Sequence, residues 1–214
     1  DTELYGKGIA DVFVSSAAKL GMTVAGRDGI DGKASDYRAV ATKVRAAKPD
    51  VVYYGGITQN NAGKLLKDLR SAGVDAPFIG PDGIFEDAFL KDAGDDAEGV
   101  YCTFGGVPVS AYTGDAKVFA EKYAKLHGGN PEAYAIYGYE MTKVALAAIA
   151  KVNVKDRAAI RDAIFATKDF KGILGTWSFD ANGDTTLTTM SVNEIKRTAE
   201  GKLEFELIEV VSAG

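Results

Sequence analysis

The segment at residues 50–56, DVVYYGG, restricts the possible folds of this chain more than any other stretch. It is a continuous run of β-branched and aromatic residues that ends in two glycines. Such a run is typical of a strand buried on both faces of a parallel sheet. Because parallel strands need a crossover connection, usually a helix, the segment predicts an α/β protein.

Helix and strand patterns alternate on both sides of this run. Helices are expected at residues 5–20, 35–48 and 58–73, and further strands at 22–30, 76–84 and 97–106. The first helix is expected to have Ile9, Val12, Phe13, Ser16 and Leu20 on one helical stripe. The alternation with short loops predicts a doubly wound, mostly parallel sheet, in which ligands bind beyond the carboxyl ends of the strands.

The pattern changes after residue 112. Three helices are expected, at 113–129, 130–152 and 156–169. The second is apolar nearly all round, so we expect it to be heavily buried. The remaining sequence has the pattern of β-hairpins, with turns at Asn182-Gly183 and Glu200-Gly201.

Composition and single residues argue against several functions. The net charge of −5 argues against nucleic acid as a partner. One cysteine, Cys102, and one histidine, His127, exclude a Cys/His zinc cluster and disfavour a Ser-His-Asp triad. The sequence has no phosphate loop and no nucleophile elbow, so neither an enzyme nor a cofactor or metal site is predicted. No apolar run is long enough to span a membrane.

Two residues stand out as candidates for binding. Tyr5 lies at the entrance of the first helix, either as an aromatic lid on the helix start or as a ring that faces a cleft. Asp82, in GPDG, is either a turn aspartate or a carboxylate placed to hold an ammonium group. From the residues alone, both interpretations stay open.

An ordered set of segments resembles a known family. The segments YGKG, VVYYGG with AGKLLKDLRSAG, FIGPDG, DDAEGVY and GTWSFDANGD resemble periplasmic binding proteins of branched-chain amino acid ABC transporters, the leucine/isoleucine/valine-binding type. The resemblance runs along the whole chain. It implies the type I periplasmic binding protein fold, with two flavodoxin-like lobes that close on a ligand, here in incomplete form.

The resemblance also implies an organisation for the chain. In that family, DTELYGKG follows directly on the first strand of the second lobe, so we expect a C-terminal fragment. Residues 1–130 would be the second lobe without its first strand, 131–174 the helices that return to the first lobe, and 175–214 the hinge and terminal β segments. The missing N-terminal half or a second copy is expected to fill the gap left by that strand.

The resemblance carries over to four positions. It implies that Tyr5 closes over the ligand and that Asp82, at a position commonly occupied by glutamate, pairs with the ligand's ammonium group. Ile57 stands where a tyrosine is usual, and Phe85 is expected beside it.

The implied ligand is a branched-chain or other aliphatic L-amino acid. The implied partner is the membrane permease of an ABC transporter, and the implied location is the periplasm or, as an anchored lipoprotein, the outside of the cell. Two alternatives remain: a ligand-sensing receptor or regulator on the same fold, and a binding protein for an aromatic or aliphatic carboxylate.

Overall fold

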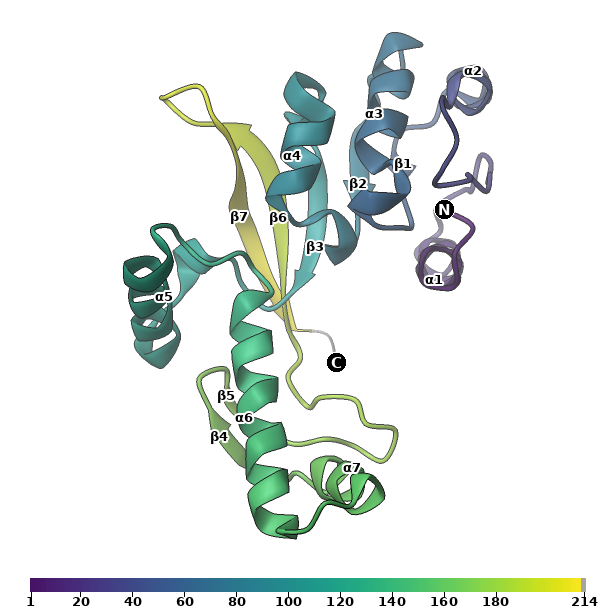
Figure 1. Ribbon diagram of the computed structural model, residues 1–214. Helices are drawn as coiled ribbons and strands as arrows, with labels where there is room; N and C mark the ends of the chain where they lie inside the picture. The colour runs from purple at the N-terminus through teal and green to yellow at the C-terminus, as the bar shows by residue number, and fades with distance from the viewer. Residues whose placement is uncertain (213–214) are drawn as a thin grey trace. The chain divides into compact units, whose positions relative to one another are not determined.

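Three short parallel strands begin the main sheet, and each is followed by a helical segment (Figure 1). The computed structural model describes residues 1–212. Its first half contains α1 (Leu4–Lys19), α2 (Arg38–Ala47), β1 (Val52–Tyr53), α3 (Ala62–Ser71), β2 (Phe78–Gly80), the 3-10 turn η2 (Asp82–Ile84), α4 (Asp87–Ala93) and β3 (Tyr101–Gly105). The second half contains α5 (Gly114–His127), α6 (Ala135–Val152), α7 (Arg157–Phe165), β4 (Phe170–Gly172), β5 (Gly175–Trp177), β6 (Thr189–Arg197) and β7 (Leu203–Ser212).

The five-stranded sheet has the order β1-β2-β3-β6-β7. The β1–β2 and β2–β3 pairs are parallel, whereas the β3–β6 pair is antiparallel. In register, Tyr53 lies opposite Ile79, and Ile79 lies opposite Tyr101. The predicted α/β class and the parallel run of strands are therefore confirmed.

The chain forms two compact units. The first comprises Asp1–Gly105 with Met190–Val211 and holds the sheet, while the second comprises mainly Gly106–Thr189. These boundaries differ from the limits at 130 and 174 that the family resemblance implied, and the assignment of lobes stays a prediction.

The core of the first unit lies on the face of the sheet that α3 and α4 cover (Figure 1). The strands contribute Phe78, Cys102, Phe104 and Ile195 to this core, Tyr54 adds to it directly after β1, and the two helices contribute Leu65, Leu66, Leu69, Phe89 and Ala93. Burial of these apolar side chains is the main stabilising contribution to this unit.

Of two expectations for the start of the chain, one is wrong and one holds only in part. Residues 22–30 form no strand. A strand needs a neighbour for its backbone hydrogen bonds, and within residues 1–212 the only strand beside β1 is β2. The predicted apolar stripe of α1 holds only in part, because Ile9 and Phe13 are half-buried whereas Val12 and Leu20 are exposed.

The long helix α6 is less buried than its composition predicted. One stripe faces inward, made of Ile136, Glu140, Val144 and Ala148, while Leu146 and Ile149 are exposed.

The two predicted turns are present, with positive φ angles at Gly183 and Gly201 that glycine tolerates without strain.

Glu140 joins α6 to the β4–β5 hairpin. Its side chain is fully buried and accepts hydrogen bonds from the Trp177 indole N–H at 3.0 Å and from the Ile173 backbone N–H at 3.1 Å. A Cβ on Gly172 would overlap this carboxylate, so the hairpin approaches the helix closely at that glycine. A buried carboxylate with these partners ties two elements of the second unit together.

We predict that Glu140→Ala destabilises the second unit by about 2–4 kcal/mol, because it leaves buried N–H donors without an acceptor. Trp177 is the chain's single tryptophan, so its fluorescence during urea unfolding reports on this unit. Glu121→Ala, on the exposed surface of α5, is the matched control and should change the midpoint little. Equal midpoints for the two variants would contradict this role of Glu140.

Candidate functional site

Two of the predicted residues follow the carboxyl ends of neighbouring parallel strands. Ile57 comes shortly after β1, and Asp82 comes two residues after the end of β2. Because the two strands run in parallel, the segments that follow them lie at the same edge of the sheet. This is the edge at which the sequence predicted a ligand site.

A third predicted residue reaches the same place from the other end of the first unit. The Tyr5 hydroxyl, in the first turn of α1, donates a hydrogen bond to Asp82 Oδ1 at 2.6 Å. The two residues are 77 positions apart in the sequence. A donor to a carboxylate at this distance forms a strong, charge-assisted hydrogen bond.

The surroundings of Asp82 favour the protonated form of nearby acidic groups. Burial and the hydrogen bond and charge of Asp82 raise the pKa of Tyr5, so its hydroxyl stays a neutral donor. Burial and the same charge raise the pKa of Tyr53 to about 12. Burial, followed by the charge of Asp82, raises the pKa of the Cys102 thiol, which does not fit a reactive cysteine.

Glycines allow α1 to contact the end of β1 directly. A Cβ on Gly6 would lie 2.6 Å from the backbone oxygen of Gly55, and a Cβ on Gly55 would collide with the backbone oxygen of Gly6. Seven residues further along α1, the Phe13 ring stacks on Tyr53, with centroids 3.9 Å apart and planes at 6°. These contacts set the position of the helix that carries Tyr5.

A second pair of glycines joins the two loops at this edge. A Cβ on Gly83 would lie 2.6 Å from the backbone oxygen of Gly56 and 2.8 Å from Ile57 Cγ2. The Thr58 hydroxyl also donates to the backbone oxygen of Gly83 at 3.3 Å. Ile57 is therefore held against the turn that carries Asp82.

Phe85 takes a different place from the other three residues. Its side chain is buried, and its ring lies 4.7 Å from that of Phe104 and 4.4 Å from that of Phe205, centroid to centroid. It anchors the end of η2 in the core, so a direct contact between Phe85 and a ligand stays a prediction.

The sequence analysis did not identify Tyr53 or Phe13 as part of this site. Both belong to apolar runs that fit a core position equally well. The one usable signal was the pair of adjacent glycines, Gly55 and Gly56, directly after a predicted strand. Paired glycines there indicate a close backbone approach.

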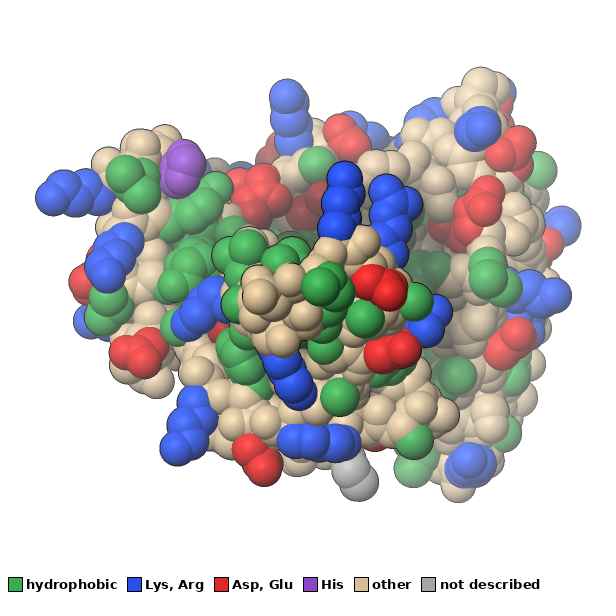
Figure 2. All heavy atoms as spheres, turned by 60° about the horizontal axis from the view of Figure 1, so that its bottom comes forward, with side chains coloured by type: hydrophobic (Ala, Val, Ile, Leu, Met, Phe, Trp, Pro, Cys, Tyr) green, Lys and Arg blue, Asp and Glu red, His purple; other side chains and the backbone are tan. Residues whose placement is uncertain are grey.

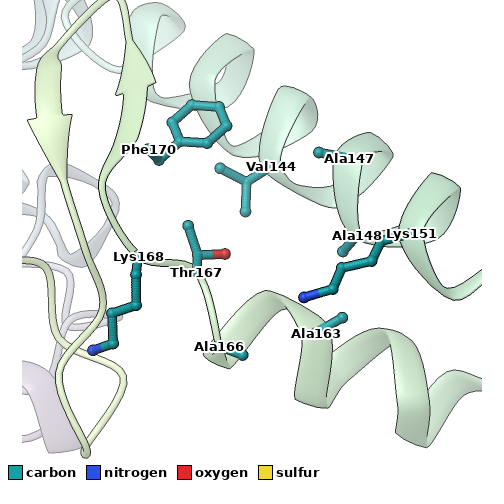
Figure 3. A pocket seen from close by; sticks show the side chains of 9 residues that line it. All are labelled: Val144, Ala147, Ala148, Lys151, Ala163, Ala166, Thr167, Lys168 and Phe170. Atoms are coloured by element: carbon teal, nitrogen blue, oxygen red, sulfur yellow. The ribbon is translucent and has the colours of Figure 1, made fainter.

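The second unit has two pockets that include none of the four predicted residues. One, of about 250 Å³, lies between α6 and α7; Figure 3 shows Val144 and Phe170 facing one another in it, with Lys151 reaching toward α7. The other, of about 520 Å³, lies beside α5 and includes Phe119, Tyr123 and His127. Figure 2 shows hydrophobic side chains gathered next to this histidine.

Within residues 1–212, no three His, Cys, Asp or Glu side chains are grouped so that they could hold a metal ion. The helices in the same range are too short or too polar to cross a membrane.

Comparison with protein families gives one decisive match. The family of periplasmic binding proteins matches residues 2–202 of the chain. The chain belongs to this family. A Leu/Ile/Val-binding protein homologue of Brucella abortus is 31% identical over 207 residues, which are 96% of this chain and 54% of the relative.

Solved structures support the same assignment. A leucine-binding protein of Thermotoga maritima superposes with a TM-score of 0.85 at 27% identity, over 98% of this chain and 58% of the other. A branched-chain amino acid binding protein of Streptococcus pneumoniae in complex with isoleucine gives a TM-score of 0.78 at 27% identity, over 96% and 57%. The chain thus has the type I periplasmic binding protein fold in incomplete form, and it spans about half the length of its relatives. These relatives are solute-binding proteins of transporters and not enzymes.

The glycine contacts predict opposite effects for two substitutions in α1. Gly6→Ala should lower the free energy of unfolding by about 1–3 kcal/mol, because its Cβ would meet the backbone of Gly55. Gly8→Ala should raise it by about 0.5–1 kcal/mol, because its Cβ would meet nothing within 4 Å and alanine favours the helix. Urea unfolding followed by far-UV circular dichroism measures both, and two stabilising changes would show that α1 does not contact Gly55 closely.

Proposed function

We propose that the chain is part of a solute-binding protein of an ABC importer that binds a branched-chain or other aliphatic L-amino acid. The observation that carries the proposal is the Asp82 carboxylate, held by Tyr5 at the carboxyl edge of parallel strands. An amino acid brings an ammonium group, and a carboxylate at this edge is the natural partner for it. The amino-acid binding proteins among the relatives support the same ligand class.

Each predicted residue has a role in this proposal. Asp82 pairs with the ligand's ammonium group, and Tyr5 lies beside it on α1. Ile57 supplies an aliphatic wall for the ligand's side chain. Phe85 supports the Asp82 turn from the core, through its contacts with Phe104 and Phe205.

The rest of the site is proposed to lie outside this chain. The chain spans 54% of the Brucella relative, so the groups that hold the ligand's carboxylate belong, in this proposal, to the remaining half. The whole protein would deliver its ligand to the membrane permease of the importer. It would work in the periplasm, or outside the cell as a membrane-anchored lipoprotein.

Two other functions are compatible with the same fold. Asp82 makes the first less favourable and does not distinguish the second. In a binding protein for an aromatic or aliphatic carboxylate, a ligand with a carboxylate and no amine would bring no positive charge to Asp82 in a closed site, which makes this alternative less favourable. A receptor or regulator that senses an amino acid would use the same Asp82 contact, and differs only in the partner that reads the bound state.

Substitution of Asp82 tests the ligand's orientation. In the full-length protein, Asp82→Ala should weaken the affinity for leucine, isoleucine or valine by about 30-fold to 1,000-fold, because the ammonium group loses its buried partner. Isothermal titration calorimetry measures the affinity. Asp75→Ala, at an exposed carboxylate, is the control and should bind as the wild type does. Unchanged affinity in Asp82→Ala would mean that the ammonium group lies elsewhere.

The isolated chain should bind leucine weakly, with a Kd no tighter than about 1 mM, because enclosure of the ligand by both lobes supplies much of the affinity in this fold. A titration followed by NMR chemical shifts measures this. Submillimolar binding by the 214-residue chain would show that the missing half contributes little to the site.

A further inference from the structure

We propose that Tyr54 is a positioning residue for the ligand's side chain: its buried hydroxyl holds the backbone of Ile57 and thereby fixes the aliphatic wall of the site. This inference rests on the proposed function, in which Ile57 supplies that wall. Tyr54 comes directly after β1 and three residues before Ile57. Its hydroxyl donates a hydrogen bond to the Ile57 backbone oxygen at 3.0 Å.

Tyr54 reaches this backbone oxygen from within the core. The residue is only 3% exposed, and its ring stacks on Phe78 with centroids 6.0 Å apart. Its backbone N–H donates to the Ile79 backbone oxygen at 2.8 Å, so its main chain is bound to the neighbouring strand β2. Burial raises the pKa of the Tyr54 hydroxyl, which therefore keeps its proton as a donor. The donor is thus carried by a side chain that is fixed both at its backbone and along its ring.

Gly56 leaves room for the tyrosine to turn back under its own loop. A Cβ on Gly56 would overlap the Tyr54 hydroxyl oxygen and would lie 2.5 Å from Tyr54 Cζ. Any residue larger than glycine at position 56 would therefore push the hydroxyl away from the Ile57 backbone oxygen. The second glycine of the pair after β1 thus serves this contact as well as the approach to Gly83.

Ile57 is held at both its backbone and its side chain. Its backbone oxygen also accepts from the Asn60 N–H at 3.2 Å, at the 3-10 turn η1 (Thr58–Asn60). Its side chain lies against Gly83 through Cγ2, as described above. A wall that is fixed before binding loses less conformational freedom when a ligand arrives. It also adjusts less to a side chain of another shape, so the Tyr54 contact acts on the ligand's side chain and not on its amino group.

The first test needs no ligand. In the 214-residue chain, Tyr54→Phe retains the ring but removes the donor to Ile57. We expect the Asn60 amide to exchange its hydrogen about 5-fold to 10-fold faster, measured by NMR, because the oxygen that it bonds is held less firmly. The amide of residue 54 itself is the internal reference, since it bonds to β2 and should exchange at an unchanged rate. Equal acceleration at both amides, or at neither, would overturn the proposal.

The second test uses ligands of different length. In the full-length protein, Tyr54→Phe should weaken the affinity for leucine by about 5-fold to 10-fold and that for alanine by less than about 2-fold, because alanine has too short a side chain to use the wall. Isothermal titration calorimetry measures both affinities. Equal losses for the two amino acids would contradict a role at the side-chain wall.

Tyr37→Phe is the matched control for both tests. Tyr37 is also buried, and its hydroxyl donates to the backbone oxygen of Asp31 at 2.7 Å. Its substitution should cost similar stability but leave the Asn60 exchange rate and the leucine-to-alanine affinity ratio unchanged. The exchange measurement does not depend on amino-acid binding, so failure of this inference is distinguishable from failure of the proposed function.

Discussion

The close approach of three backbone segments at one edge of the sheet is the constraint on which the candidate site depends. Gly6 of α1 meets Gly55 after β1, and Gly56 in the same loop meets Gly83 after β2. Any side chain at these contacts would separate the segments by the width of a methyl group or more. Only because they touch can Tyr5 and Asp82, far apart in the sequence, share a hydrogen bond.

Much of the fold was predictable because local pattern and tertiary environment agree. The apolar runs at β1, β2 and β3 and the helix α3 appear where the sequence placed them. The sequence pattern gave a wrong prediction where a strand depends on a neighbouring strand for its hydrogen bonds. Residues 22–30 have the composition of a strand, yet without a paired strand beside them they adopt none. The apolar stripe of α1 was only partly right, because Phe13 packs on Tyr53 while the helix approaches the strand most closely through the small residue Gly6.

The candidate site was predictable in its polar members and not in its supporting ones. Asp82 and Tyr5 stood out because each is unusual in its local sequence. Phe13 and Tyr53 did not, because an aromatic residue in an apolar run looks the same whether it fills a core or holds a helix in place. Phe85 is buried against Phe104, a packing contact that the sequence did not predict, since position in the sequence does not reveal to which side a residue after a turn points.

In the proposed function, the residues that would hold the ligand's amino group differ from the residue that would contact its side chain. The glycine contacts and the Tyr5–Asp82 bond involve backbone and two polar side chains, whereas Ile57 contributes an aliphatic side chain that packs on Gly83 and a backbone oxygen that accepts from Tyr54. In this proposal, a substitution at position 57 would change the aliphatic wall without removing either partner of the Tyr5–Asp82 hydrogen bond. Such a division would let related proteins evolve different ligand specificities. Single substitutions at position 57 would change which ligand side chain is accepted, while recognition of the α-amine would be retained.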